Sequence, residues 1–368
     1  MKRRTFIQLG LIAVPVAGGI IACDNTPKTQ PKPTQSAAGF DQLIKIGSVL
    51  TLTGAGAQVG QEILAGQKLA VEYWKTKGIQ VQLFSDDSKN TPKDGLSAFK
   101  ALKARGLNFF VANSSGVSLA LKPEINDTQD TLLALAAHPA ITSPLKSSVF
   151  RYSNTAADEA KTLVEWIEKA SVKNTVIIFH SADEYGIAFN NSLQASLKKL
   201  GIPNAAKAYR KEDIPEMRSL VQSALPQSTY LPVVVGSGQP MTQVITVLRT
   251  LGCDSEILTN IGFALTGVKQ QLGSQAGKIV YVELDLPANP DLAEGAKQYF
   301  KSFNKEITPD AQIGFNTISL LAKVCQKFKT IESSKINIEL LKTATSYFSP
   351  NSEFSNNEIV VKVKLYEA

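Results

Sequence analysis

The chain has 368 residues and a formal net charge of +7. Its charges form neither a block of one sign nor a basic stripe with interleaved aromatic residues, so composition gives no support to a nucleic-acid-binding or membrane-surface class. Removal of residues 1–22 takes away Lys2, Arg3 and Arg4 and lowers the charge to +4, which leaves a mildly basic chain.

The first residues combine a basic start with a short apolar run that ends in a small residue and a cysteine. This run is broken by glycine and proline and is shorter than the roughly 20 apolar residues that a membrane-spanning helix needs. Residues 1–22 are therefore predicted to be an export signal. The stretch Ile20-Ile21-Ala22-Cys23 resembles the lipobox of bacterial lipoproteins, which implies cleavage before Cys23 and a lipid on its thiol. Arg3 and Arg4 also resemble a twin-arginine signal, so the export route stays open.

Residues 23–43 are predicted to form a flexible tether, because the segment up to residue 40 is rich in Pro, Thr, Gln and Lys and too polar to build a core. Once Cys23 carries a lipid, only Cys253 and Cys325 remain. They lie far apart in the sequence, in a compartment where disulfides are allowed. We expect two buried free thiols rather than a disulfide.

From residue 44 onward, short runs of apolar and β-branched residues alternate with longer segments of helical periodicity. Between the first two runs, Ile63, Gly66, Ala70 and Tyr73 recur at spacings of three and four, which places them on one helical face. The alternation predicts a doubly wound α/β architecture. The strands are expected at residues 44–50, 79–85, 108–112, 132–136, 174–180, 230–236, 256–259 and 278–284.

The body that follows the tether is too long for a single hydrophobic core, yet no Pro- or Gly-rich linker divides it. We therefore expect two doubly wound, Rossmann-like lobes joined by a hinge that the chain crosses several times. Lobe 1 is expected at residues 44–153 with 281–345, and lobe 2 at residues 154–280 with 346–368.

The stretch IKIGSVLTLTGAGAQVGQEILAGQKLAVEYWKTKGI resembles the opening strand, loop and helix of the type I periplasmic binding proteins, in their leucine/isoleucine/valine branch. The likeness continues at Asn113-Ser114-Ser115-Gly116, Phe150-Arg151 and Asp183-Glu184-Tyr185-Gly186 and fades after about residue 282. It implies the periplasmic-binding-protein-like fold and a substrate-binding lipoprotein of an ABC importer. Such a protein lies on the outer face of the bacterial cytoplasmic membrane, anchored by the lipid on Cys23, and its partners are a small ligand and the permease subunits.

Small hydroxyl residues follow the third expected strand, where a helix begins near Val117. A helix start is an anion site, because its first N–H groups are unpaired and the helix dipole is positive there. Ser114 or Ser115 can also be no more than an N-cap. The resemblance favours Ser115 as a ligand of the bound carboxylate. It also implies contacts from the backbone of Ala136 and Ala137, where Ala137 lacks the hydroxyl that the family commonly has.

Other ligand contacts come from the resemblance alone. It implies that Tyr185 reaches from lobe 2 onto the ligand, with Asp183 in the same loop. Gln239 matches a further cleft position that is often aromatic, and Val59 replaces a tyrosine that is common in the family. With two aromatic residues exchanged, we expect a different ligand shape.

One position weakens the case for an ordinary amino acid. The amino-acid-binding members usually place a carboxylate for the ligand's ammonium where this chain has Ile261. A buried ammonium without a partner costs several kcal/mol. Either Asp183, Glu184 or Asp86 replaces that carboxylate, or the ligand carries no ammonium.

Catalysis has little support in this sequence. The only histidines, His138 and His180, have no partner at metal-ligand spacing, and there is no nucleophile elbow, P-loop or dinucleotide fingerprint. We expect no enzyme, no cofactor and no metal. The predicted mechanism is closure of the lobes on a small carboxylate-bearing ligand. A branched-chain or other aliphatic amino acid is the leading interpretation. An aromatic acid, keto acid or amide, a sensory lipoprotein and a surface hydrolase remain as alternatives.

Overall fold

The computed structural model describes residues 39–54, 56–143, 148–226, 229–265, 267–286, 289–304, 306–348, 354–355, 358–359 and 362–368. All of them belong to one compact unit, Ser36–Ala368. The predicted export signal, Cys23 and most of the predicted tether lie outside the described residues.

The first sheet has seven strands in the order β11-β12-β5-β4-β3-β1-β2, and all neighbours are parallel except β11 and β12. Its inner strands are continuous apolar runs because helices cover both faces of a parallel sheet. The strands are β1 (Ile44–Leu50), β2 (Val81–Asp87), β3 (Phe109–Asn113), β4 (Thr131–Leu135), β5 (Val149–Tyr152), β11 (Phe354–Ser355) and β12 (Glu358–Ile359).

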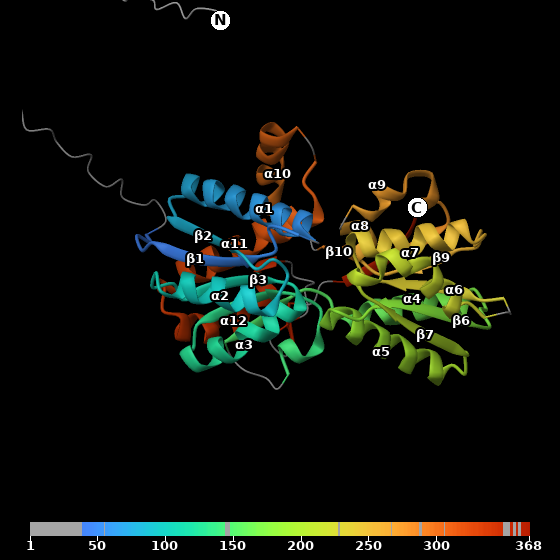
Figure 1. Ribbon diagram of the computed structural model, residues 1–368. Helices are drawn as coiled ribbons and strands as arrows, with labels where there is room; N and C mark the ends of the chain where they lie inside the picture. Colours follow the sequence, from blue (N-terminus) through green and yellow to red (C-terminus); the bar gives the residue numbers. More distant parts are fainter. Residues whose placement is uncertain are drawn as a thin grey trace, which may run out of the picture. The chain divides into compact units, whose positions relative to one another are not determined.

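Alternate residues of β3 show how the helices cover the two faces of this sheet. Phe109 and Val111 pack in one core cluster with α1 and α11, whereas Phe110 and Ala112 pack in another with α2 and α3 (Figure 1). We call this sheet and its helices the first lobe. The helices are α1 (Ala57–Thr76), α2 (Pro92–Lys103), α3 (Ser115–Thr128), η1 (Pro139–Ile141), α10 (Pro290–Phe303), α11 (Pro309–Phe328) and α12 (Ser333–Phe348).

The second sheet has six strands in the order β13-β10-β9-β8-β6-β7, with only β13 antiparallel to its neighbour. Its strands are β6 (Thr175–His180), β7 (Asn204–Tyr209), β8 (Leu231–Val235), β9 (Ile257–Thr259), β10 (Ile279–Asp285) and β13 (Lys362–Glu367). With its helices it forms the second lobe, and α4 and α5 share one core cluster while α6 and α7 share the other. The helices are α4 (Ala156–Lys169), α5 (Glu184–Lys199), η2 (Lys211–Glu216), α6 (Met217–Ala224), α7 (Gly238–Thr250), α8 (Gly262–Leu265), α9 (Val268–Leu272) and η3 (Gly273–Ala276).

The predicted pair of doubly wound α/β lobes is confirmed. All eight expected strands are present, with ends within two residues of the predicted ones. Five strands were not expected: β5, which contains a buried arginine, the edge strand β7, and β11, β12 and β13 near the C-terminus. Between the described strands the chain passes from one sheet to the other three times: after β5, after β10 and after β12.

Two expected lobe boundaries do not coincide with the sheets. The boundary between residues 280 and 281 falls inside β10, which pairs with β9 and β13 in the second sheet. The segment 346–368 is divided, because β12 pairs with β5 of the first sheet and β13 with β10 of the second. The hydrophobic pattern predicts where a strand lies. The sheet that the strand joins depends on pairing with strands far away in the sequence.

The predicted free thiols are also present. Cys325 is buried in the core of the first lobe, as expected, but Cys253 is partly exposed. Burial raises the pKa of the Cys325 thiol to about 12, so this cysteine is inert in the folded protein.

Candidate ligand-binding site

A cavity of about 280 Å³ is lined by segments that follow strands of both sheets. In the first lobe these segments follow β1, β2, β3, β4 and β5, and in the second lobe they follow β6, β8 and β9. Loops beyond the carboxyl ends of parallel strands are where α/β folds bind ligands. The cavity is therefore the candidate site of this protein.

The start of α3 forms one wall of the cavity. Ser114 and Ser115 both line it, and Ser115 is buried with an exposed fraction of 5%. Its N-cap residue, Ser114, makes no side-chain cap hydrogen bond, whereas Thr91, Thr155 and Asp183 cap α2, α4 and α5. The first N–H groups of α3 are thus left for an anion.

Backbone strain accompanies this uncapped helix start. Ser114 has a φ of 71°, a conformation that costs a non-glycine residue of the order of 1–3 kcal/mol. The preceding Asn113 accepts a hydrogen bond from the Thr51 N–H through its side-chain oxygen, at 2.8 Å. This bond fixes the loop after β1 against the start of α3.

Ala136 and Ala137 follow β4, are buried and line the cavity, as the sequence suggests. The Ala137 carbonyl accepts a hydrogen bond from the Ala156 N–H, at 3.0 Å, at the start of α4. This carbonyl therefore already has a partner that joins β4 to the first helix of the second lobe.

Tyr185 lines the cavity from α5 but is held by partners within the second lobe. Its hydroxyl donates to the Glu159 carboxylate at 2.7 Å and accepts from the Asn260 side-chain amide at 3.0 Å. Burial and the adjacent Glu159 raise the pKa of the Tyr185 hydroxyl well above its usual value. Because the hydroxyl donates to Glu159, its oxygen keeps one lone pair for a ligand.

Glu159 is a cavity residue that the sequence analysis missed. It is fully buried in α4 and accepts hydrogen bonds from the Ile261 N–H at 3.0 Å and the Asn154 amide at 2.6 Å, besides Tyr185. Burial raises the pKa of this carboxyl to about 7, although the three donors oppose that shift. The available signal was an acidic residue on the apolar face of α4, beside Ala156 and Leu163.

The predicted replacements for a carboxylate at position 261 have other partners. Asp183 caps α5 by accepting from the Gly186 N–H at 2.7 Å, and its other oxygen lies 3.0 Å from the His180 ring nitrogen Nδ1. Glu184 lines the cavity with a half-exposed side chain, 4.0 Å from the ring of His138.

The remaining predicted residues separate into two groups. Val59 and Ile261 line the cavity, whereas Asp86 and Gln239 are not among its described lining residues. Gln239 is exposed near the start of α7, and Asp86 accepts a hydrogen bond from the backbone of its neighbour, Asp87.

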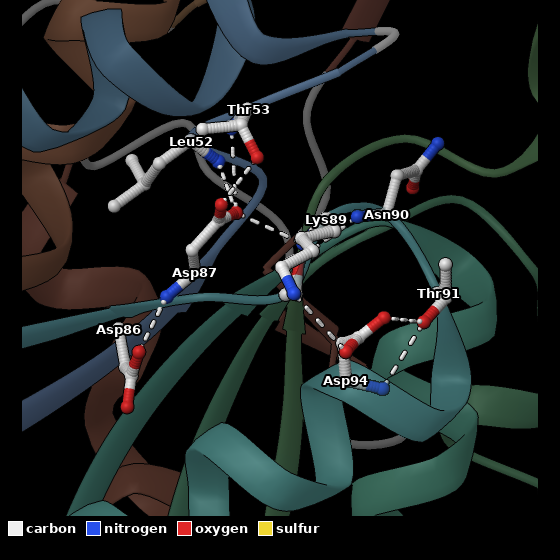
Figure 2. Close-up of polar contacts among 9 residues, drawn as sticks. Leu52, Thr53, Asp86, Asp87, Lys89, Asn90, Thr91 and Asp94 are labelled. Atoms are coloured by element: carbon white, nitrogen blue, oxygen red, sulfur yellow. Dashed lines mark hydrogen bonds and ion pairs between the residues drawn. The ribbon is translucent and has the colours of Figure 1, made fainter.

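Asp87 ties together two loops through its hydrogen bonds, as Figure 2 shows. Its carboxylate accepts from the backbone N–H groups of Leu52 and Lys89, both at 2.9 Å, and from the Thr53 hydroxyl at 2.5 Å. Partial burial is opposed by these hydrogen bonds, which together lower the pKa of the carboxyl. Thr51 and Asn90, which line the cavity, lie in the two loops that Asp87 joins.

A second buried carboxylate that the sequence analysis missed belongs to Asp310, at the start of α11. Together with Glu159, Asp183 and Glu184 it gives the cavity four acidic residues, while its described lining contains no Lys, Arg or His. Within the described part of the chain no group of acidic, Cys or His side chains could hold a metal ion.

Comparison with known proteins identifies the family. The model of the family described as "Periplasmic binding protein" matches residues 43–357. The chain belongs to this family. No helix in the described ranges is long and apolar enough to cross a membrane.

Relatives of this periplasmic binding protein confirm its resemblance to the leucine/isoleucine/valine branch. It is 27% identical over 173 residues to "Leu/Ile/Val-binding protein homolog 3" of Brucella melitensis, a match that covers 45% of this chain and 46% of the relative. The chain thus spans less than half the length of the curated relatives that it matches.

Solved structures of low sequence identity share the fold. The leucine-binding protein LivK of Thermotoga maritima superimposes with a TM-score of 0.78 at 18% identity, over 88% of this chain and 95% of that one. A solute-binding protein of Rhodopseudomonas palustris, in complex with 3,4-dihydroxybenzoic acid, gives 0.71 at 14% identity, over 88% and 93%. The same fold therefore occurs with quite different ligands.

Proposed function

We propose that this periplasmic binding protein captures a small α-amino acid and delivers it to the permease subunits of an ABC importer. The ligand carboxylate is placed at the start of α3, on Ser115 and the free N–H groups. Closure of the two lobes holds the ligand, since a ligand shifts a two-state equilibrium only through contacts that favour the closed state.

The observation that carries the proposal is the charge of the cavity. One wall offers a helix start to an anion, and the lining contributes four acidic side chains without a basic one among the described residues. A zwitterion meets both requirements, because its carboxylate takes the helix start and its ammonium faces the acidic groups. An aromatic acid or a keto acid brings a negative charge and no cation.

The proposed ammonium site is the Tyr185 hydroxyl with Glu159 behind it. The hydroxyl oxygen accepts from the ammonium, and the buried carboxylate supplies the opposite charge at 2.7 Å from that oxygen. A nearby cation favours the ionised form of Glu159, whose pKa burial holds at about 7 in the structure without ligand. In this proposal, Tyr185 and Glu159 bind the ammonium in place of the carboxylate that many family members have where this chain has Ile261.

Export and anchoring are part of the proposal and rest on the sequence of residues 1–23. The basic, apolar and small-residue segments precede Cys23, which we propose carries the lipid that keeps the protein at the outer face of the cytoplasmic membrane. We propose no catalytic role, because the family is one of binding proteins.

A thermal-shift panel tests the ligand class. L-amino acids are compared with the keto acids that share their side chains and with 3,4-dihydroxybenzoate, on the purified protein. A ligand at 100 times its Kd adds about 2.7 kcal/mol to the free energy of unfolding and raises the Tm measurably. We expect shifts with amino acids alone. A shift with a keto acid or the aromatic acid, and none with any amino acid, would contradict the proposal.

A further inference from the structure

Asp310 is a buried carboxylate without a partner at the wall of the cavity. It is the second residue of α11, lines the cavity and has an exposed fraction of 5%. No hydrogen bond or ion pair from the described residues reaches its side chain, although Thr308 beside it caps the helix. Buried polar groups are nearly always paired, so an unpaired carboxylate at a cavity wall points to a partner in the cavity.

The surroundings of Asp310 favour a cation as that partner. Burial and the like charge of Glu62 both raise the pKa of the Asp310 carboxyl well above its usual value. Glu62 itself accepts hydrogen bonds from Tyr299 and Thr308, at 2.6 and 3.1 Å. A positive group from the ligand offsets the cost of an ionised Asp310 in this position.

An apolar strip borders this carboxylate. Ile313 is three residues along α11 from Asp310, on the same face, and also lines the cavity. Val59 and Ile63, four residues apart on α1, line it as well, and α1 meets α11 where Ala311 contacts Gly66. An alkyl stem with a charged nitrogen at its end matches an apolar strip that ends in a carboxylate.

We infer that Asp310 determines side-chain specificity and that the preferred ligand is an amino acid whose side chain ends in a protonated amine, such as lysine. The inference rests on the proposed amino-acid function. The carboxylate binds the start of α3, the α-ammonium faces Tyr185 and Glu159, and the side chain runs along Val59 and Ile63 to Asp310. This class differs from the branched-chain amino acids named for the relatives.

Calorimetric titration with L-lysine and L-norleucine tests the inference. The two ligands share the same four-carbon stem, and only lysine carries the terminal amine. Removing one partner of a buried, hydrogen-bonded charge pair costs about 2 kcal/mol or more, so the unmodified protein should bind lysine at least about 30-fold more tightly than norleucine, which leaves Asp310 unpaired. Asp310→Asn should abolish this preference and leave the norleucine affinity within about threefold. Glu306→Gln, an exposed acid in the preceding loop, is the matched control and should change neither affinity.

Each outcome of the titration decides the matter. If the unmodified protein binds norleucine as tightly as lysine, the role of Asp310 is overturned and the amino-acid function still stands. This comparison needs no variant. An unchanged lysine preference in Asp310→Asn has the same consequence. If the protein binds neither ligand, this inference is overturned. If no amino acid in the thermal-shift panel raises the Tm, the proposed function is overturned as well.

Discussion

At the scale of single residues, carboxylates decide the chemistry of this protein by where they are buried. Asp87 is half-buried among hydrogen-bond donors, and its pKa is lowered. Glu159 has three donors as well, but complete burial outweighs them and raises its pKa to about 7. A carboxylate thus joins two loops at Asp87, whereas the carboxylate of Glu159 on α4 is part of the proposed ammonium site.

Glu159 makes stability depend on pH. Its pKa is 4.5 in an ordinary environment and about 7 in the folded protein, so the folded state binds more protons between these values. The contribution of Glu159 to the free energy of unfolding is therefore greatest below about pH 4.5 and falls as pH rises to about 7. The predicted loss is on the order of 3 kcal/mol.

Chemical denaturation of the unliganded protein at pH 5 and pH 8 measures this loss. In Glu159→Gln the difference between the two pH values should shrink by most of that amount, because the titrating group is gone. Glu168→Gln changes an exposed acid on the same helix and is a control for general effects of charge. A pH difference that is equal in Glu159→Gln and the unmodified protein would contradict the assignment.

At the scale of elements, the crossing of α1 and α11 supports the wall that carries Asp310. A methyl group on Gly66 would lie 1.8 Å from the Ala311 carbonyl oxygen, and one on Gly314 would lie 2.0 Å from the Ile63 carbonyl oxygen. Each helix therefore presents a glycine to the backbone of the other. Close approach of two helices needs residues without a side chain at the contact.

Gly66→Ala should separate these helices and destabilise the first lobe. The favourable helix propensity of alanine, about 1 kcal/mol, is smaller than the cost of forcing two backbones apart, which is typically about 1–3 kcal/mol and more for a rigid contact. Denaturant unfolding measures the difference. Gly277→Ala is the control, because its nearest neighbour would be 3.8 Å away and its φ is −60°. Equal stability of the two variants would show that the helices can shift without cost.

At the scale of the whole molecule, the chain passes between its two sheets three times in the described strands, and segments of both lobes line one cavity. Ser115 comes from the first lobe and Tyr185 from the second, yet both line one cavity. A ligand that contacts both residues stabilises the closed arrangement, which is the condition for capture by closure.

A substitution on either lobe should therefore weaken ligand binding. The ligand for this test is the amino acid that raises the Tm most in the thermal-shift panel. Ser115→Ala removes a hydroxyl from a charged carboxylate and should cost about 1–3 kcal/mol of binding free energy. Tyr185→Ala should weaken binding to a similar extent, and titration calorimetry measures both. Ser192→Ala, whose hydroxyl donates to the Ala188 carbonyl within α5, is the control. An unchanged affinity would assign the substituted residue to packing.

Much of this organisation is predictable from the sequence. Local patterns predicted the eight principal strands and the two α/β lobes. These features follow from the period of apolar residues, which depends on neighbours a few residues away. The resemblance to the family added Ser115, Ala136 and Tyr185, which line one cavity.

Only the tertiary structure decided the rest. It assigned β10 and β13 to the second sheet and β12 to the first, and it brought Glu159 and Asp310 to one cavity from helices far apart in the sequence. Strand partners and the burial of a carboxylate depend on contacts between distant segments, which a local pattern does not contain. The charge of the cavity, and with it the proposed ligand class, is a property of the folded chain.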